Sequence, residues 1–365
     1  MSKLFSSVSV GKLVLNNRII VSPMCQYSAE QGQASDWHLI HLGHMALSGA
    51  GLLFIEATAV TPEGRISPAD LGLWSDQTEA ALARVIQSIR HYSATPIAIQ
   101  LAHAGRKAST QVPWQGGQAM SPQNGGWQTV APSALPFAAE GVLPLALDEA
   151  GMDQIKNDFV TAAKRAHNLG LEAIEMHAAH GYLLHQFLSP LSNIRDDRYG
   201  GSLANRMRFP LEVFEAVRVA MPSDMPVGVR ISATDWLAGG WDIEQSIVFG
   251  KELRRRGCEF IDVSSGGLSP LQQIPLEPGY QVPFAEKVRR ETGLTTIAVG
   301  LISEPEQAET IISSGQADMV ALARGMLYDP RWPWHAAAKL GAQVFAPKQY
   351  LRSQPRGLNN LFKPV

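Results

Sequence analysis

The sequence is poor in cysteine and has no long apolar run. Cys25 and Cys258 are its only cysteines in 365 residues, which excludes a disulfide framework, a four-cysteine zinc site and a cysteine-ligated iron–sulfur cluster. The apolar stretch at residues 51–55 ends at Glu56, far short of the about 20 residues that a membrane helix needs. Residues 1–10 lack the apolar core of a signal peptide. We therefore expect a cytoplasmic protein that does not enter a membrane.

The chain also lacks an excess of charge of either sign. It carries 31 Lys and Arg against 33 Asp and Glu, a formal net charge of -2. This balance excludes a nucleic-acid or acidic-membrane partner held by bulk electrostatics. Hydrophobic residues make up 45% and charged residues 18%, as in ordinary soluble globular proteins.

Short apolar or β-branched runs recur along the chain and predict strands that alternate with helices. Residues 152–169 have a helical stripe of Ile155, Phe159, Ala162 and Ala166, and residues 245–256 have a similar pattern. Such alternation predicts a single-domain α/β protein, 1–365, folded as a (β/α)8 TIM barrel. The competing doubly wound sheet lacks its usual G-x-G-x-x-G turn. The eight predicted strands are residues 18–24, 52–58, 96–103, 173–177, 226–232, 260–264, 296–300 and 319–324.

Four other segments complete the predicted architecture. Residues 4–15 predict a β-hairpin that caps the bottom of the barrel. Residues 107–144, rich in Gly, Pro, Gln and Ser, are too long for a simple connection and predict a functional loop after the third strand. A last helix is expected at residues 334–340, followed by a tail at 341–365.

Two histidines and a tyrosine gather at the end of the predicted fourth strand, at His177, His180 and Tyr182. The ends of barrel strands converge on one mouth, where ligands bind. A metal site is a rival interpretation because imidazole binds zinc. The two rings can converge only if the strand ends at His177 and the chain then turns. For His44 and His185 we favour ordinary packing roles.

Alternation along residues 227–231 directs Arg230 into the barrel, whereas the apolar Val227, Val229 and Ile231 face the helices. A buried guanidinium needs an anionic partner, which is either a ligand or an ion pair with Glu56 or Glu175. The same parity turns Gln100 inwards, where its amide can donate and accept. Small residues near Gly300 and Arg324, at the last two strand ends, indicate a phosphate site.

Five motifs carry a resemblance that extends from residue 5 to about 335. They are Ser22-Pro-Met-Cys-Gln-Tyr27, Gln100-Leu-Ala-His-Ala-Gly-Arg106, His177-Ala-Ala-His-Gly-Tyr182, Asp197-Arg-Tyr-Gly-Gly-Ser202 and Ala298-Val-Gly-Leu-Ile302. Together they resemble the old yellow enzyme family of FMN-dependent ene-reductases. Cysteine at 25 with tyrosine at 27 is similar to its bacterial xenobiotic-reductase and thermophilic-type subclass.

The resemblance implies non-covalent FMN in the barrel mouth and NADPH or NADH as the reductant. The isoalloxazine would be surrounded by Ser22, Pro23, Met24, Cys25, Ala57, Gln100 and Arg230. The ribityl phosphate would be held by Val299, Gly300, Ala323 and Arg324. Ala323 is a departure, since relatives often have glycine at that position.

The resemblance also implies an NADPH dehydrogenase that reduces the C=C bond of α,β-unsaturated carbonyl compounds, and nitro compounds as further substrates. His177 and His180 would bind the carbonyl oxygen, Tyr182 would donate the proton and Tyr27 would position the ligand. Without a separate dinucleotide-binding motif, reductant and substrate would share one pocket and react in ping-pong order. In a homodimer or homotetramer, Arg352 would reach a neighbouring active site; the alternative is an exposed basic tail.

Cys25 at the flavin-facing motif is expected to tune the flavin potential, whereas its alternative role is that of a small buried hydrophobe. Cys258 and residues 197–206 are interpreted as structural, with Ser202 as a helix N-cap. Two other classes stay open on the residues alone. A metal-dependent hydrolase would use the histidines and Cys25 around zinc, and a binding module would use the rim without chemistry.

Overall fold

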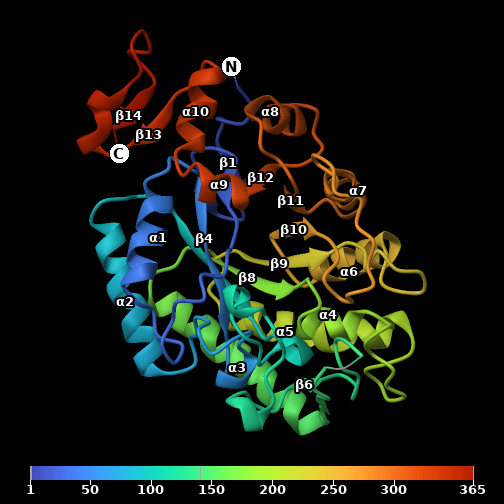
Figure 1. Ribbon diagram of the computed structural model, residues 1–365. Coiled ribbons are helices and arrows are strands. Elements are labelled where there is room, and N and C mark those ends of the chain that lie inside the picture. Colours follow the sequence, from blue (N-terminus) through green and yellow to red (C-terminus); the bar gives the residue numbers. More distant parts are fainter. Residues whose placement is uncertain (1, 140, 365) are drawn as a thin grey trace.

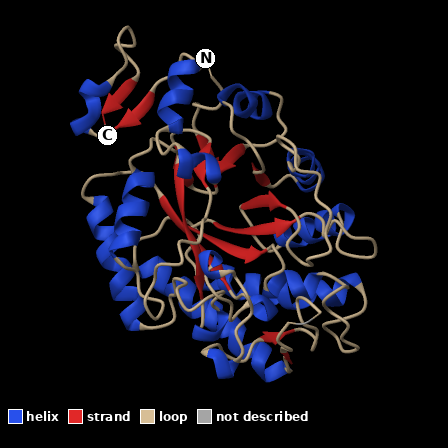
Figure 2. Cartoon of the chain, viewed as in Figure 1, coloured by secondary structure: helices blue, strands red, loops and turns tan. Residues whose placement is uncertain are grey.

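Eight parallel strands close into a barrel in the computed structural model, which describes residues 2–139 and 141–364. Figure 2 shows the strands at the centre and most helices around them. Each barrel strand overlaps one of the eight predicted runs, so the predicted (β/α)8 fold is confirmed. In sheet order they are β10 (Phe260–Ser264), β11 (Thr295–Ala298), β12 (Met319–Leu322), β3 (Ile19–Val21), β4 (Leu52–Ala59), β5 (Ile97–Ala102), β8 (Ala173–Ala178) and β9 (Val227–Ser232).

The connecting helices follow the strands in chain order (Figure 1). The predicted helix at 152–169 is α3, which starts earlier because Asp148 caps it by accepting from the Gly151 N–H. The predicted N-cap Ser202 accepts from the Asn205 N–H at the start of α5. The helices are α1 (Asp36–Ala46), α2 (Asp76–Arg90), α3 (Glu149–Asn168), α4 (Leu183–Leu188), α5 (Leu203–Ala220), α6 (Ile243–Arg255), α7 (Val282–Thr292), α8 (Pro305–Ser313), α9 (Arg324–Tyr328) and α10 (Trp332–Lys339).

Two hydrophobic layers hold the barrel together. Outward-facing residues such as Val227 and Val229 pack against the helices, and Cys258 is buried in this outer layer. Inside, Phe54 and Phe260 fill the lower half of the barrel together with Val10. Val10 belongs to the antiparallel hairpin of β1 (Val8–Val10) and β2 (Leu13–Leu15). The predicted cap on the barrel bottom is therefore confirmed.

Two segments carry strand pairs that the sequence did not predict. The long loop after β5 carries a small parallel pair, β6 (Val130–Ala131) with β7 (Leu145–Ala146). In the C-terminal tail, β13 (Val344–Ala346) pairs with β14 (Phe362–Pro364), and Trp334 of α10 packs against the pair. Figure 1 shows this unit beyond α10, at the edge of the molecule. Within the described ranges, no helix has both the length and the apolar character needed to cross a bilayer.

Candidate active site at the carboxyl ends of the barrel strands

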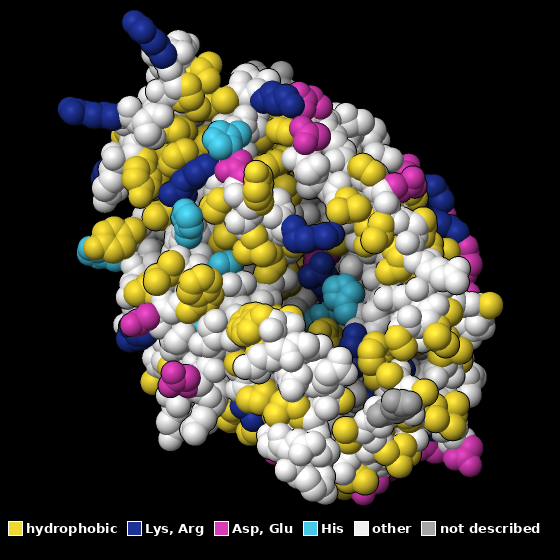
Figure 3. Space-filling model, viewed as in Figure 1, with side chains coloured by type: hydrophobic (Ala, Val, Ile, Leu, Met, Phe, Trp, Pro, Cys, Tyr) yellow, Lys and Arg dark blue, Asp and Glu magenta, His cyan; other side chains and the backbone are white. Residues whose placement is uncertain are grey.

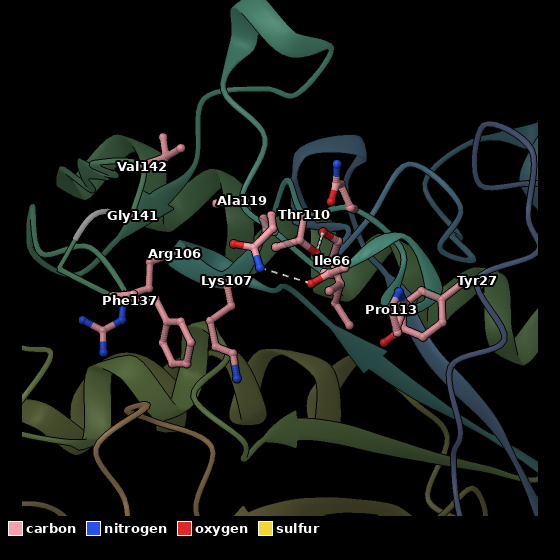
Figure 4. Close-up of a pocket in the computed structure, with 16 residues that line it drawn as sticks. Tyr27, Ile66, Arg106, Lys107, Thr110, Pro113, Ala119, Phe137, Gly141 and Val142 are labelled. Atoms are coloured by element: carbon pink, nitrogen blue, oxygen red, sulfur yellow. Dashed lines mark hydrogen bonds between the residues drawn. The ribbon is translucent and has the colours of Figure 1, made fainter.

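The carboxyl ends of the eight strands meet at one mouth because all of them run in parallel. Figure 3 shows a hollow near the centre of this face, with His and with Lys or Arg side chains around it. A cavity of about 730 Å³ adjoins it, lined among others by Tyr27, Lys107 and Phe137. In Figure 4, Tyr27 lies at one end of this cavity and Phe137 at the other. The mouth is thus open to a sizeable organic ligand.

A tight turn after β8 brings His177, His180 and Tyr182 together. His180 and Gly181 have φ of 58° and 74°, so the chain reverses through left-handed backbone immediately after the strand. The ring centroids of His177 and His180 lie 5.2 Å apart, and those of His177 and Tyr182 4.9 Å apart. From the sequence, the two imidazole rings could meet only if the strand ended at His177 and the chain then turned. The rings do meet, although the strand ends one residue later, at Ala178.

Hydrogen bonds orient both imidazoles. Nδ1 of His177 accepts from the Ala179 N–H at 3.2 Å, which leaves its proton on Nε2. Nε2 of His180 lies 2.7 Å from Ser264 Oγ, and its backbone N–H donates to Ser232 Oγ at 2.9 Å. Burial, and then the charge of Arg230, hold the pKa of both imidazoles well below its usual value. Both are thus neutral rings near pH 7, each with one N–H to donate.

Tyr182 is a protonated phenol at neutral pH. Burial raises its pKa well above the ordinary value, and the nearby Cys25 and Tyr27 add to this effect. A phenol that keeps its proton can deliver it to a carbon that gains negative charge during a reaction.

The segment after β3 runs along the mouth beside these side chains. Ser22 Oγ is buried and has no hydrogen-bond partner among the described residues. Burial, followed by the charges of Asp70 and Glu56, raises the pKa of Cys25 well above the usual value. Cys25 is therefore a neutral thiol. Tyr27 has φ of 48° and its ring meets Trp114 of the long loop edge-on, at 6.0 Å between centroids.

The inward parity of Arg230 and Gln100 is confirmed, and the partner of Arg230 is a correction. Arg230 Nε lies 3.2 Å from Asp262 Oδ2, whereas the sequence offered Glu56 or Glu175. Asp262 is opposite Arg230 in the register of β9 and β10. Gln100 Nε2 donates to Glu175 Oε1 at 2.7 Å, and Ala57 is the register neighbour of Gln100.

The two last strand ends lie side by side, since β11 pairs with β12. Val299 is buried, and Gly300 has φ of 120°, where a Cβ would come 2.7 Å from Gln281 Nε2. Both strands are shorter than predicted, and β12 ends at Leu322. Ala323 has a backbone conformation that is neither helical nor extended, and Arg324 then begins α9 with an exposed side chain. This arrangement leaves the Arg324 guanidinium free to meet an anion at the rim.

Lys107 is a site residue that strand periodicity missed. Its Nζ donates to the carbonyl oxygens of His180 at 2.8 Å and Gly267 at 2.9 Å, and lies 5.2 Å from the centre of the Tyr182 ring. Burial, and then the charge of Arg106, lower its pKa to about 8. It follows directly on the Gln100–Arg106 motif, and that position was its only sequence signal.

Three further placements concern the alternative interpretations. Arg352 is exposed in the C-terminal unit packed on α10, so one chain does not bring it to its own barrel mouth. His185 pairs with Asp235 at 2.9 Å and is fully buried, as a packing role requires. Across residues 2–139 and 141–364, no three His, Cys, Asp or Glu side chains are grouped as metal ligands.

Comparison with known proteins finds close relatives over nearly the whole chain. Residues 3–343 match the NADH:flavin oxidoreductase / NADH oxidase family. An NADPH dehydrogenase of Listeria innocua is 44% identical over 355 residues, which cover 97% of this chain and 99% of the relative. A solved morphinone reductase is 30% identical with a TM-score of 0.77, covering 99% of this chain and 93% of that one. A morphinone reductase complex with tetrahydroNAD is 28% identical with a TM-score of 0.75, covering 99% and 97%.

Proposed function

Because the chain belongs to the NADH:flavin oxidoreductase / NADH oxidase family, we propose that it reduces the C=C bond of α,β-unsaturated carbonyl compounds. It is an oxidoreductase, for which the family implies FMN and a nicotinamide reductant. The observation that carries the proposal is the meeting of two neutral imidazoles and a protonated phenol at the barrel mouth. Nitro compounds are proposed as further substrates of the same site.

The residues at the mouth fit FMN chemically. Three polar groups are suited to the edge of an isoalloxazine: the Gln100 amide, the Arg230 guanidinium and the buried Ser22 hydroxyl, which has no hydrogen-bond partner among the described residues. When bound, FMN supplies hydride transfer from the nicotinamide to the substrate. In this proposal the ring lies against Ser22, Pro23, Met24, Cys25, Ala57, Gln100 and Arg230, and the phosphate meets Val299, Gly300, Ala323 and Arg324.

His177 and His180 would hold the substrate carbonyl oxygen with their N–H groups. These hydrogen bonds strengthen as negative charge builds on that oxygen, so they favour the transition state over the bound substrate. Tyr182 would hold the proton destined for the α-carbon, on the face opposite to the hydride, and Tyr27 would position the ligand. Arg230, beneath the mouth, supplies positive charge where a reduced flavin is negative.

Nicotinamide and enone would use the same pocket, and the two half-reactions would follow each other in ping-pong order. Parallel lines in double-reciprocal initial-rate plots would support this order, and intersecting lines would contradict it.

We further propose a single domain, 1–365, that forms homodimers or homotetramers in which Arg352 reaches a neighbouring mouth. The exposure of Arg352 supports its contact with a neighbouring subunit. We also propose a cytoplasmic location, which the free thiols of Cys25 and Cys258 support.

The first test follows the absorption spectrum of the purified protein through one reaction cycle. We expect a yellow protein whose flavin band bleaches on anaerobic addition of NADPH and returns when 2-cyclohexenone is added. A band that bleaches but does not return with the enone would reject the substrate class and keep the family. A protein that neither retains nor rebinds FMN would reject the whole assignment.

Replacing Cys25 by alanine is expected to leave FMN bound and to shift its reduction potential. The neutral thiol lies in the segment proposed to face the flavin, where a change of polarity alters the relative stability of the oxidised and reduced ring. Spectroelectrochemical titration measures the shift, and Cys258→Ala, in the outer core, is the control. An unchanged potential in Cys25→Ala would show that the thiol only packs.

A further inference from the structure

A polar layer crosses the interior of the barrel directly below the mouth. It is made by Gln100 on β5, Glu175 on β8, Arg230 on β9 and Asp262 on β10. These are successive strands of the sheet, and in its register Gln100 lies beside Glu175, and Arg230 beside Asp262. Below the layer the interior is apolar, with Phe260 packed against Gly228. The four side chains therefore form two contacting pairs, Gln100 with Glu175 and Arg230 with Asp262, on adjacent strands of the barrel.

The layer contains two carboxyl groups and one cation, all buried. Glu175 is 0% and Asp262 1% exposed, and Arg230 is 7% exposed. Arg230 Nε lies 3.2 Å from Asp262 Oδ2, and Gln100 Nε2 donates to Glu175 Oε1 at 2.7 Å. Within the part of the chain that the structure describes, Glu175 Oε2 and Asp262 Oδ1 have no hydrogen-bond partner.

Two buried carboxylates cannot both be ionised beside a single guanidinium without a large desolvation cost. Burial raises the pKa of Asp262 as well, but Arg230 forms an ion pair with this carboxyl and opposes the rise. Glu175 has only a neutral amide as its hydrogen-bond donor. Burial, and then the charge of Asp262, raise its pKa to about 8 against the opposing effects of Arg230 and Gln100. Of the two carboxyls, Glu175 is therefore the one that is protonated at neutral pH.

We propose that Glu175 is a positioning residue that acts through Arg230 and that, where it is ionised in the oxidised enzyme, it takes up one proton when a bound flavin is reduced. The inference rests on the proposed function, because it needs a flavin that gains negative charge next to Arg230. The negative charge of the reduced flavin would interact with the Arg230 guanidinium, which then stabilises the negative charge of the two carboxylates less. The ionised form of Glu175 then becomes less stable, and the group binds a proton.

The proton balance is explicit. A hydride from the nicotinamide brings two electrons and one proton to the flavin, which becomes an anion. Where Glu175 is ionised beforehand, a second proton passes from solvent to its carboxylate and forms the neutral acid. Below about pH 8 Glu175 is already protonated in the oxidised enzyme, so one proton is taken up per two electrons. Above that pH the number rises from one towards two.

The test is the pH dependence of the flavin midpoint potential between pH 7 and 10, in the wild type and in Glu175→Gln. In the wild type we expect the slope against pH to double above about pH 8. In the variant, whose amide cannot titrate, the slope should stay at the one-proton value, and its potential should be higher than that of the wild type only at high pH. The matched control is Glu172→Gln, three residues earlier and paired with Arg90 at the other end of β8; it should behave as the wild type.

Two outcomes would overturn the proposal: a wild-type slope that does not change, or a constant offset of Glu175→Gln at every pH, which is what a structural role alone would produce. If Glu175→Gln does not fold, the reduced-minus-oxidised infrared spectrum of the wild type at pH 9 decides, since a protonated carboxylic acid must appear on reduction. Failure of this inference can be distinguished from failure of the proposed function. A protein that binds no FMN fails both, whereas one that bleaches with NADPH and takes up a single proton throughout fails this inference alone.

Discussion

Replacing Tyr182 by phenylalanine is expected to slow the reoxidation of the reduced enzyme by 2-cyclohexenone about 10²–10⁴-fold, the usual worth of a positioned proton donor. The change removes one oxygen from a side chain whose ring contact with His177, at 4.9 Å between centroids, phenylalanine can keep. Bleaching of the flavin by NADPH requires no proton from Tyr182. That half-reaction should therefore keep its rate.

Stopped-flow absorbance separates the two half-reactions. Tyr199→Phe is the matched control, because the Tyr199 hydroxyl contacts Glu212 and Arg198 away from the mouth. It should leave both rates unchanged. Equal losses in both half-reactions of Tyr182→Phe would point to a disturbed pocket, and an unchanged enone rate would show that solvent supplies the proton.

Replacing Gly181 by alanine is expected to damage both stability and activity. Gly181 has φ of 74°, and a Cβ there would lie 2.2 Å from the carbonyl oxygen of Gly267. Left-handed backbone costs a residue with a Cβ about 1–2 kcal/mol, and overpacking against main chain adds about 1–3 kcal/mol. Because Gly181 stands between His180 and Tyr182, relief of the clash moves both side chains. A displacement of about 1 Å reduces catalysis by the order of 10²-fold.

Gly201→Ala separates the two causes. Gly201 has nearly the same φ, 73°, but among the described residues a Cβ there would meet no atom within 4 Å apart from its own chain neighbours. It should lose only the conformational part of the unfolding free energy and keep full enone reduction. Urea unfolding of both variants, together with their turnover of 2-cyclohexenone, measures the difference. Equal destabilisation in the two variants would mean that the turn after β8 adapts to the extra methyl group.

The barrel was predictable because strand and helix periodicities are local properties of the chain. Eight apolar runs separated by amphipathic segments leave few alternatives to a closed parallel sheet, and all eight became strands. The two-residue repeat of a strand also determined that Arg230 and Gln100 face inwards. The proximity of His177 and His180 could be expected only conditionally, since it depends on left-handed backbone at His180, which is not a glycine.

The partner choices were not predictable. Arg230 could pair with any inward carboxyl, and the register of β9 against β10 selected Asp262. Lys107 reaches Tyr182 from a short 3-10 helix that has no periodic signal. The packing of the C-terminal segment against Trp334 was also not predicted, because its apolar residues are spread too thinly along the sequence to form a recognisable pattern.

The sequence by itself determined the strands, the face of each strand and the group of polar side chains at their carboxyl ends. These follow from alternation along the chain and from the parallel direction of the strands. The tertiary structure alone decided which of those side chains touch, and therefore which carboxyl holds a proton and which imidazole nitrogen can donate. Such choices depend on distances of a few ångströms between strands far apart in sequence, and on the burial that the closed barrel imposes on all of them.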